Sequence, residues 1–147
     1  MNILRSVLAV LVGFFVGSLV NLALVKAGPA VFPPPAGADM TTPQGIAAAL
    51  PLLQPEHFLF PWLAHALGTF CGALVAFLLA GPRGVPCAWF IGGLTLLGGV
   101  SAAFMIPAPA WFLAADLLGA YLPATWLAIR LGSRLSPPAR ASTPPAP

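Results

Sequence analysis

Charged side chains are scarce in this sequence. Its 147 residues include six lysines and arginines and three aspartates and glutamates, so 6% of the chain is charged, whereas 59% is hydrophobic. A soluble domain has about a quarter of its residues charged. A surface built from this composition cannot be covered with polar groups, which excludes a soluble globular protein and indicates that lipid surrounds the chain.

Patterns that would indicate nucleic-acid binding or a metal site are also missing. The net charge of +3 comes mainly from arginines beside apolar runs, which indicates membrane orientation and no nucleic-acid partner. Cys71 and Cys87 lack a CxxC motif and a neighbouring histidine pair. We interpret them as buried, unreactive thiols, with a redox or metal role as the less favoured alternative. We expect no metal and no cofactor.

Four apolar runs are long enough to cross a membrane. A helix needs about 20 apolar residues to span the hydrocarbon core, and the runs cover residues 3–25, 58–79, 88–106 and 110–131. None of them alternates like a strand of a membrane barrel, and so few segments could not close one. The sequence therefore predicts an all-α fold, a four-transmembrane-helix bundle forming one domain over residues 1–131.

The first run has a second interpretation as a cleaved signal peptide, with Arg5 as its basic start and KAGPA as its cleavage region. The run is longer than the apolar core of such a peptide, and Gly13, Gly17 and Asn21 are typical of helix packing. We therefore favour a membrane span.

The segments outside these helices differ in length and composition. Residues 26–57 form a long proline-rich outer loop between the first two helices, in which VFPPPAGADM predicts an extended path and TTPQGIAAAL at most a two-turn helix. The loop is either a linker across the bundle or a lid or partner-binding segment. The turn PAP at 107–109 predicts a tight hairpin of the third and fourth helices. Residues 132–147 are predicted to be a disordered cytoplasmic tail.

Basic residues are distributed unevenly about the predicted helix ends. The outer loop has only Lys26, beside the acidic Asp39 and Glu56. The other side has Arg5, Arg83, Arg130, Arg134 and Arg140. Because positive residues stay on the cytoplasmic side, we expect both termini to be cytoplasmic.

Small residues recur at four-residue spacing within all four apolar runs. Such ridges let helix backbones approach closely in lipid, where no hydrophobic force drives helices together. We predict helix contacts, within one chain or between copies, at six glycines: Gly13, Gly17, Gly68, Gly72, Gly99 and Gly119.

Three polar residues fall on these ridges at a common depth. Asn21 continues the first ridge, while His65 and Asp116 each precede a glycine of their own ridge by three residues. At about 1.5 Å of rise per residue, all three lie roughly 6–11 Å below the outer boundary. We therefore predict that Asp116 lies within hydrogen-bonding or single-water reach of His65, Asn21 or both. The cluster either pins the helices together or forms a proton, ion or ligand site.

Nothing places a serine or cysteine nucleophile beside His65, so we do not predict an enzyme. The favoured interpretation is an integral membrane protein with a structural or partner-binding role, whose partners are the lipid bilayer and a second copy or another membrane protein. The alternative is a small proton-linked transporter or channel that uses Asp116 and His65.

Three segments carry a resemblance: FPPPAGADMTTP in the outer loop, LAHALGTFCGALVA in the second helix and IPAPAWF at the turn into the fourth. In their order and spacing the chain is similar to a family of small bacterial four-helix membrane proteins that is usually described as uncharacterised. The resemblance implies a multi-pass protein of the bacterial cytoplasmic (inner) membrane and implies no particular activity.

Overall fold

The computed structural model describes residues 3–136, and no strand occurs among them. Short 3-10 turns follow α2, precede α3 and separate α3 from α4. The helices are α1 (Ile3–Val31), α2 (Pro43–Ala49), α3 (Leu59–Ala80), α4 (Gly84–Met105), α5 (Ala110–Gly119) and α6 (Leu122–Leu135). The predicted all-α fold is therefore confirmed.

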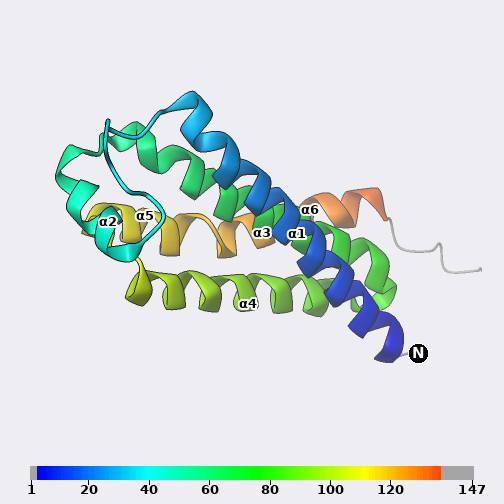
Figure 1. The fold of residues 1–147 in the computed structure, drawn as a ribbon. Coiled ribbons are helices and arrows are strands. Elements are labelled where there is room, and N and C mark those ends of the chain that lie inside the picture. The colour runs from blue at the N-terminus through cyan, green and yellow to red at the C-terminus, as the bar shows by residue number, and fades with distance from the viewer. Residues whose placement is uncertain (1–2, 137–147) are drawn as a thin grey trace, which may run out of the picture.

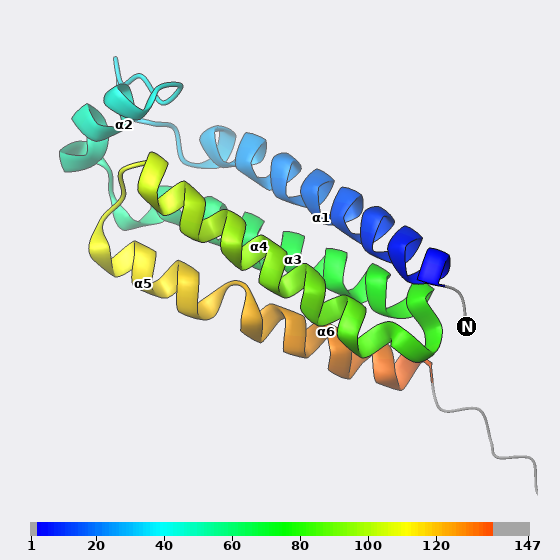
Figure 2. The same cartoon turned by 90° about the horizontal axis from the view of Figure 1, so that it is seen from below.

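Helix α3 is the centre of the bundle. It packs against α1, α4, α5 and α6, whereas α1 packs chiefly on α3 and touches α4 only slightly. Figures 1 and 2 show α1 and α4 on different flanks of α3, with α5 and α6 following one another along its remaining side. The short α2 lies at one end of the bundle, and the start of α1 lies at the other (Figure 1).

Three helical stretches are long and apolar enough to cross a membrane. They are Ile3–Val31, Pro55–Met105 and Ala110–Leu135, and the second of them contains both α3 and α4. Together with the composition, these stretches indicate a membrane-embedded protein.

Helix α1 is longer than predicted. It continues past residue 25 to Val31, through Pro29. Gly28 is buried against Phe60, where an added Cβ would lie 2.9 Å from the Phe60 Cβ, and Phe32 packs edge-on against the same ring. These contacts with α3 stabilise the extra turns, so the outer connection is shorter than the expected residues 26–57.

The predicted fourth helix, residues 110–131, is in fact two helices. α5 ends at Gly119 and α6 begins at Leu122. Pro123 lies in the first turn of α6, where its missing N–H is tolerated, whereas inside a continuous helix it would remove a hydrogen bond and clash with the preceding turn. Helix α6 also runs to Leu135, so the expected disordered tail is wrong for residues 132–135. Residues 137–147 of that tail lie outside the described part of the chain.

The outer connection is ordered by its own hydrogen bonds. Asp39 accepts bonds from the Thr41 N–H at 2.8 Å and from the hydroxyls of Thr41 and Thr42 at 2.6 and 2.7 Å. The Thr42 hydroxyl in turn accepts from the Gly45 N–H and caps α2, the predicted two-turn helix. The hydroxyl of Thr41, then that of Thr42, lowers the pKa of Asp39 to about 2.

His57 joins two distant parts of the same connection. Its Nδ1 accepts a hydrogen bond from the Gln54 N–H at 3.0 Å, and its Nε2 lies 3.1 Å from the Pro33 carbonyl oxygen. The neutral tautomer with hydrogen on Nε2 satisfies both contacts. This imidazole therefore fixes the segment after α1 against the segment before α3.

The glycine ridges of α1 and α3 meet each other within one chain. An added Cβ at Gly13 would lie 2.6 Å from the Gly72 carbonyl oxygen, and one at Gly17 would lie 2.6 Å from that of Gly68. Separations this short leave no room for any side chain. The predicted contacts at these four glycines are confirmed, and the two backbones touch.

The other two predicted packing glycines differ from each other. Gly99 lies directly against the Tyr121 hydroxyl, where an added Cβ would collide with it. At Gly119 an added Cβ would lie 3.6 Å from Trp62 Nε1, which is an ordinary contact. The predicted helix contact at Gly119 therefore exists, through the Trp62 side chain of α3, but it does not require a glycine.

We expect Gly72→Leu to lower the free energy of unfolding by about 3 kcal/mol, because a leucine would force α1 away from α3. The matched control is Gly93→Leu on α4, since an added Cβ at Gly93 meets no atom within 4 Å. Thermal melting in detergent would measure both. Equal melting temperatures for the two variants would contradict a backbone contact at this ridge.

Candidate functional site

Asp116 on α5 is a buried carboxylate inside the bundle, with 4% of its surface exposed. The Nδ1 atom of His65 on α3 lies 2.8 Å from its Oδ1 and 2.9 Å from its Oδ2. The Tyr121 hydroxyl donates a further hydrogen bond to Oδ2 at 3.1 Å. The predicted proximity of Asp116 and His65 is therefore confirmed, and the carboxylate is satisfied by two side chains.

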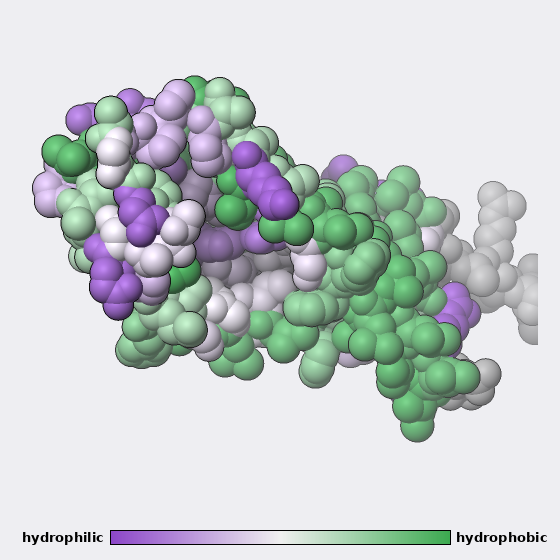
Figure 3. Space-filling view, viewed as in Figure 1, coloured by the Kyte–Doolittle hydropathy of each residue, from purple (hydrophilic) through white to green (hydrophobic). Residues whose placement is uncertain are grey.

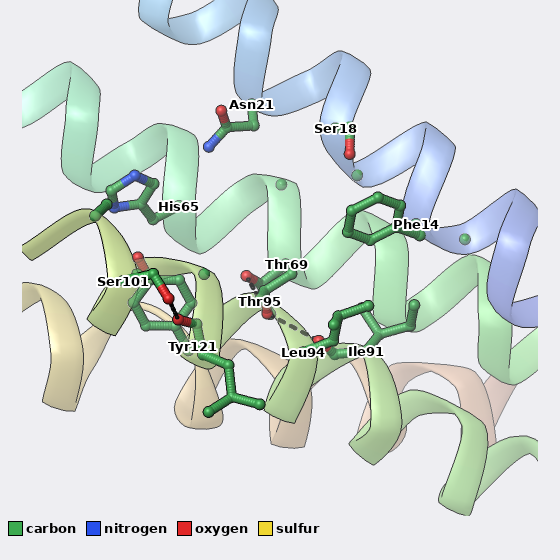
Figure 4. A pocket seen from close by; sticks show the side chains of 17 residues that line it. Phe14, Ser18, Asn21, His65, Thr69, Ile91, Leu94, Thr95, Ser101 and Tyr121 are labelled. Carbon is green, nitrogen blue, oxygen red and sulfur yellow. Dashed lines mark hydrogen bonds between the residues drawn. The ribbon is translucent and has the colours of Figure 1, made fainter. Parts of the chain in front are cut away.

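Of the two partners predicted for Asp116, His65 contacts the carboxylate and Asn21 does not. Among the described residues, its amide makes no hydrogen bond with Asp116 or His65; instead it lines the same cavity as His65. Figure 4 shows the Asn21 side chain extending from α1 toward α3, with His65 on the facing helix. Asn21 therefore lines the cavity beside His65 but does not bind the carboxylate.

Tyr121 is a site residue that the sequence did not reveal. In a continuous helix, residues five apart are rotated by about 500°, so the side chains of residues 116 and 121 would point about 140° apart. The break between α5 and α6 removes this constraint and brings the hydroxyl back to Asp116. The sequence feature that indicates this break is Pro123, which lies in the first turn of α6.

Neighbouring residues pack closely around this cluster. The rings of His65 and Tyr121 are stacked, with centroids 5.5 Å apart and an interplanar angle of 26°. Gly99 on α4 leaves the space that the Tyr121 hydroxyl occupies. Trp62 Nε1 donates a hydrogen bond to the Ala115 carbonyl at 3.1 Å and so ties α3 to α5 one residue before the carboxylate.

A cavity of about 530 Å³ lies in front of this cluster, between α1 and α4. We call it the groove. Figure 3 shows it as a hollow in the molecular surface with hydrophilic atoms inside and hydrophobic residues along the adjoining surface. Its polar lining side chains are Ser18, Asn21, His65, Thr69, Thr95, Ser101 and Tyr121, and its larger apolar ones are Phe14, Ile91, Leu94 and Leu97.

Some of these polar groups are satisfied within the protein. Thr69 donates to the Thr95 hydroxyl at 3.2 Å, and Thr95 donates to the Ile91 carbonyl at 2.9 Å. Ser101 donates to the Leu97 carbonyl one turn earlier. The hydrogens of these three hydroxyls are therefore not available to an occupant of the groove.

Other polar groups of the groove have no partner among the described residues: the Ser18 hydroxyl, the Asn21 amide and His65 Nε2. Since every buried side-chain nitrogen and oxygen in this part of the chain has a hydrogen-bond partner, Asn21 and His65 Nε2 lack one because they are open to the groove. Polar groups in hydrocarbon are costly without a partner. These three groups therefore require water or a bound molecule.

The His65–Asp116 pair determines what Nε2 presents to the groove. Nδ1 faces both carboxylate oxygens, so Nε2 is the ring nitrogen that lies toward the groove. In the ion pair of imidazolium and carboxylate, both ring nitrogens carry hydrogen, and Nε2 donates to the groove.

The described residues contain no group of three or more His, Cys, Asp or Glu side chains that could hold a metal ion. Cys71 is partly exposed and Cys87 is buried, and both are free thiols. The chemistry that the geometry supports is hydrogen bonding to a molecule in the groove.

We expect Asp116→Leu to weaken the bundle by roughly 1–2 kcal/mol, because His65 and Tyr121 both lose their acceptor. Asp116→Asn keeps the shape and a carbonyl acceptor and should cost less. Leu118→Ala on the same helix is the control, since Leu118 is 78% exposed. Melting in detergent measures all three, and an Asp116→Leu variant as stable as Leu118→Ala would show that the carboxylate does not hold the helices.

Comparison of the chain with protein families, with curated proteins and with solved structures found no match.

Proposed function

We propose that this protein is a four-span integral protein of a bacterial cytoplasmic membrane, of the four-helix family that its sequence resembles, and that it binds a partner in the groove between α1 and α4. The single observation that carries the binding role is the set of unpartnered polar groups on the groove wall.

Four spans follow if the apolar stretch Pro55–Met105 crosses the membrane twice. It turns at Gly81–Arg83, and α3 and α4 have 22 residues each, or about 33 Å of helix. That length matches a hydrocarbon core of about 30 Å. The two helices lie side by side in Figure 2, as two spans joined by a short turn would.

The proposed orientation rests on the basic residues at one end of the bundle. Arg5 Nε donates to the Leu79 carbonyl at 2.7 Å, which brings the start of α1 to the end of α3. The turn with Arg83 follows there, and Arg134 lies in the last turn of α6. We assign this end, with both termini, to the cytoplasmic side.

Cysteine labelling tests the topology in a Cys71→Ala/Cys87→Ala background. Gln44→Cys should react with a membrane-impermeant maleimide on intact cells, and Val85→Cys only after permeabilisation. Both positions are exposed, whereas Gly45 and Gly84 have no room for a side chain. The reverse pattern would invert the orientation, and external labelling at both sites would contradict the four spans.

A binding role agrees with the geometry better than a transport role does. The unpartnered groups lie in the part of the bundle nearer α2. The part nearer Gly81 is filled by an apolar buried cluster that includes Ala9, Ala76, Ala88 and Ala128. A groove that ends on a packed core is suited to holding a molecule, whereas a proton or ion pathway would have to continue through that core.

Filling the groove should remove its occupant without disturbing the fold. Gly98 lines the groove, and an added Cβ there meets no atom within 4 Å, so a leucine would project into the open space. Native mass spectrometry of protein extracted from its membrane should detect a bound membrane component or a second copy in the wild type. We expect Gly98→Leu to lose that species.

Gly93→Leu is the matched control, because Gly93 lies on the same helix, has the same open surroundings and does not line the groove. It should retain the bound species. Circular dichroism and melting would establish that both variants fold. If wild type and Gly98→Leu gave the same spectrum of bound species, the groove would not be a binding site.

A further inference from the structure

We propose that the occupant of the groove is an uncharged, membrane-soluble ring compound with carbonyl groups, of the quinone class, whose carbonyl oxygen accepts a hydrogen bond from His65 Nε2. This inference rests on the proposed binding function and narrows it to one chemical class. It concerns binding alone and requires no change in the redox state of the molecule.

The hydrogen-bonding groups can bind an acceptor. His65 Nε2 donates when His65 and Asp116 form an ion pair, in which Nδ1 donates to the carboxylate. The Asn21 amide on the facing helix offers two further hydrogens. A carbonyl oxygen accepts two hydrogen bonds and brings no donor of its own into the hydrocarbon, so it matches the groove at a lower desolvation cost than a hydroxyl.

The charge of the groove requires an uncharged molecule. None of the described residues that line it is Lys, Arg, Asp or Glu. Asp116 lies behind His65 and Tyr121 and already accepts their hydrogen bonds. An anionic head would find no unpaired cation, and a cationic head no unpaired carboxylate, so a charged molecule would not recover its lost hydration.

The depth of the groove distinguishes a quinone from a phospholipid. His65 lies six residues into α3, or about 9 Å below the end of the helix. The ester carbonyls of a phospholipid are held near the interface by a charged headgroup, whereas an uncharged ring compound dissolves throughout the hydrocarbon.

The walls and the size of the groove also fit a ring compound with an apolar chain. Phe14, Leu94 and Leu97 line the groove beside the polar groups, and Figure 4 shows Phe14 and Leu94 on the same cavity as His65. Its volume of about 530 Å³ lies within the range of roughly 300–1,000 Å³ that small-molecule sites occupy. The polar end then holds the ring and the apolar part holds the beginning of the chain.

Nitrogen-15 NMR of the two histidines tests this proposal in the full chain, with decylubiquinone as the probe. We expect a saturable shift of the His65 imidazole signals and none for His57, which lies in the outer connection and is the internal reference. Decylbenzene, which has the chain and ring without carbonyls, should shift neither. Gly98→Leu should weaken binding by at least about tenfold, and Gly93→Leu should not.

Three results would overturn the inference: no His65 shift with decylubiquinone, an equal shift with decylbenzene, or saturable binding of dioleoylglycerol in place of the quinone. If one of them occurred while Gly98→Leu still removed the species bound in the membrane, the groove would remain a binding site. Only the assignment of its occupant to the quinone class would be wrong. Asn21→Leu adds a second variant that leaves the His65–Asp116 pair intact, and it should lower the affinity for decylubiquinone.

Discussion

Direct backbone contact between α1 and α3 is the constraint on which the other features depend. Gly13 and Gly17 face Gly72 and Gly68 with no side chain between them, so α1 lies deep against α3 along this ridge. In lipid, where burying apolar side chains gains nothing, such close packing is the main attraction between helices. Because α1 is held to α3, it makes little contact with α4, and the space between α1 and α4 becomes the groove.

Several features of this arrangement could be predicted from the sequence because each depends on residues close together along the chain. Length and hydropathy located the apolar helices, and four-residue spacing identified the glycine ridges of α1 and α3. Asp116 and His65 could be paired by depth, because a buried carboxylate in hydrocarbon requires a partner at its own level. These predictions use only helix geometry and the cost of burying polar groups.

The remaining features depend on contacts that spacing does not encode. The break before Pro123 brings Tyr121 to the carboxylate, whereas helical periodicity places these two residues on different faces. The extension of α1 through Pro29 follows from packing of Gly28 on Phe60, far away in the sequence. Asn21 lines the groove with His65 and makes no hydrogen bond with Asp116, because close contact at the ridge fixes the position of α1 but does not determine which side chains form pairs.

The groove opens between α1 and α4, on the side of the bundle and not at its end. In a membrane, that opening faces acyl chains, so an occupant would arrive by lateral diffusion within the bilayer and would never cross an aqueous phase. Occupancy would then follow the mole fraction of the compound in the lipid, and its aqueous solubility would be irrelevant. Membrane composition, through its capacity to dissolve the occupant, would set the fraction of protein that is loaded.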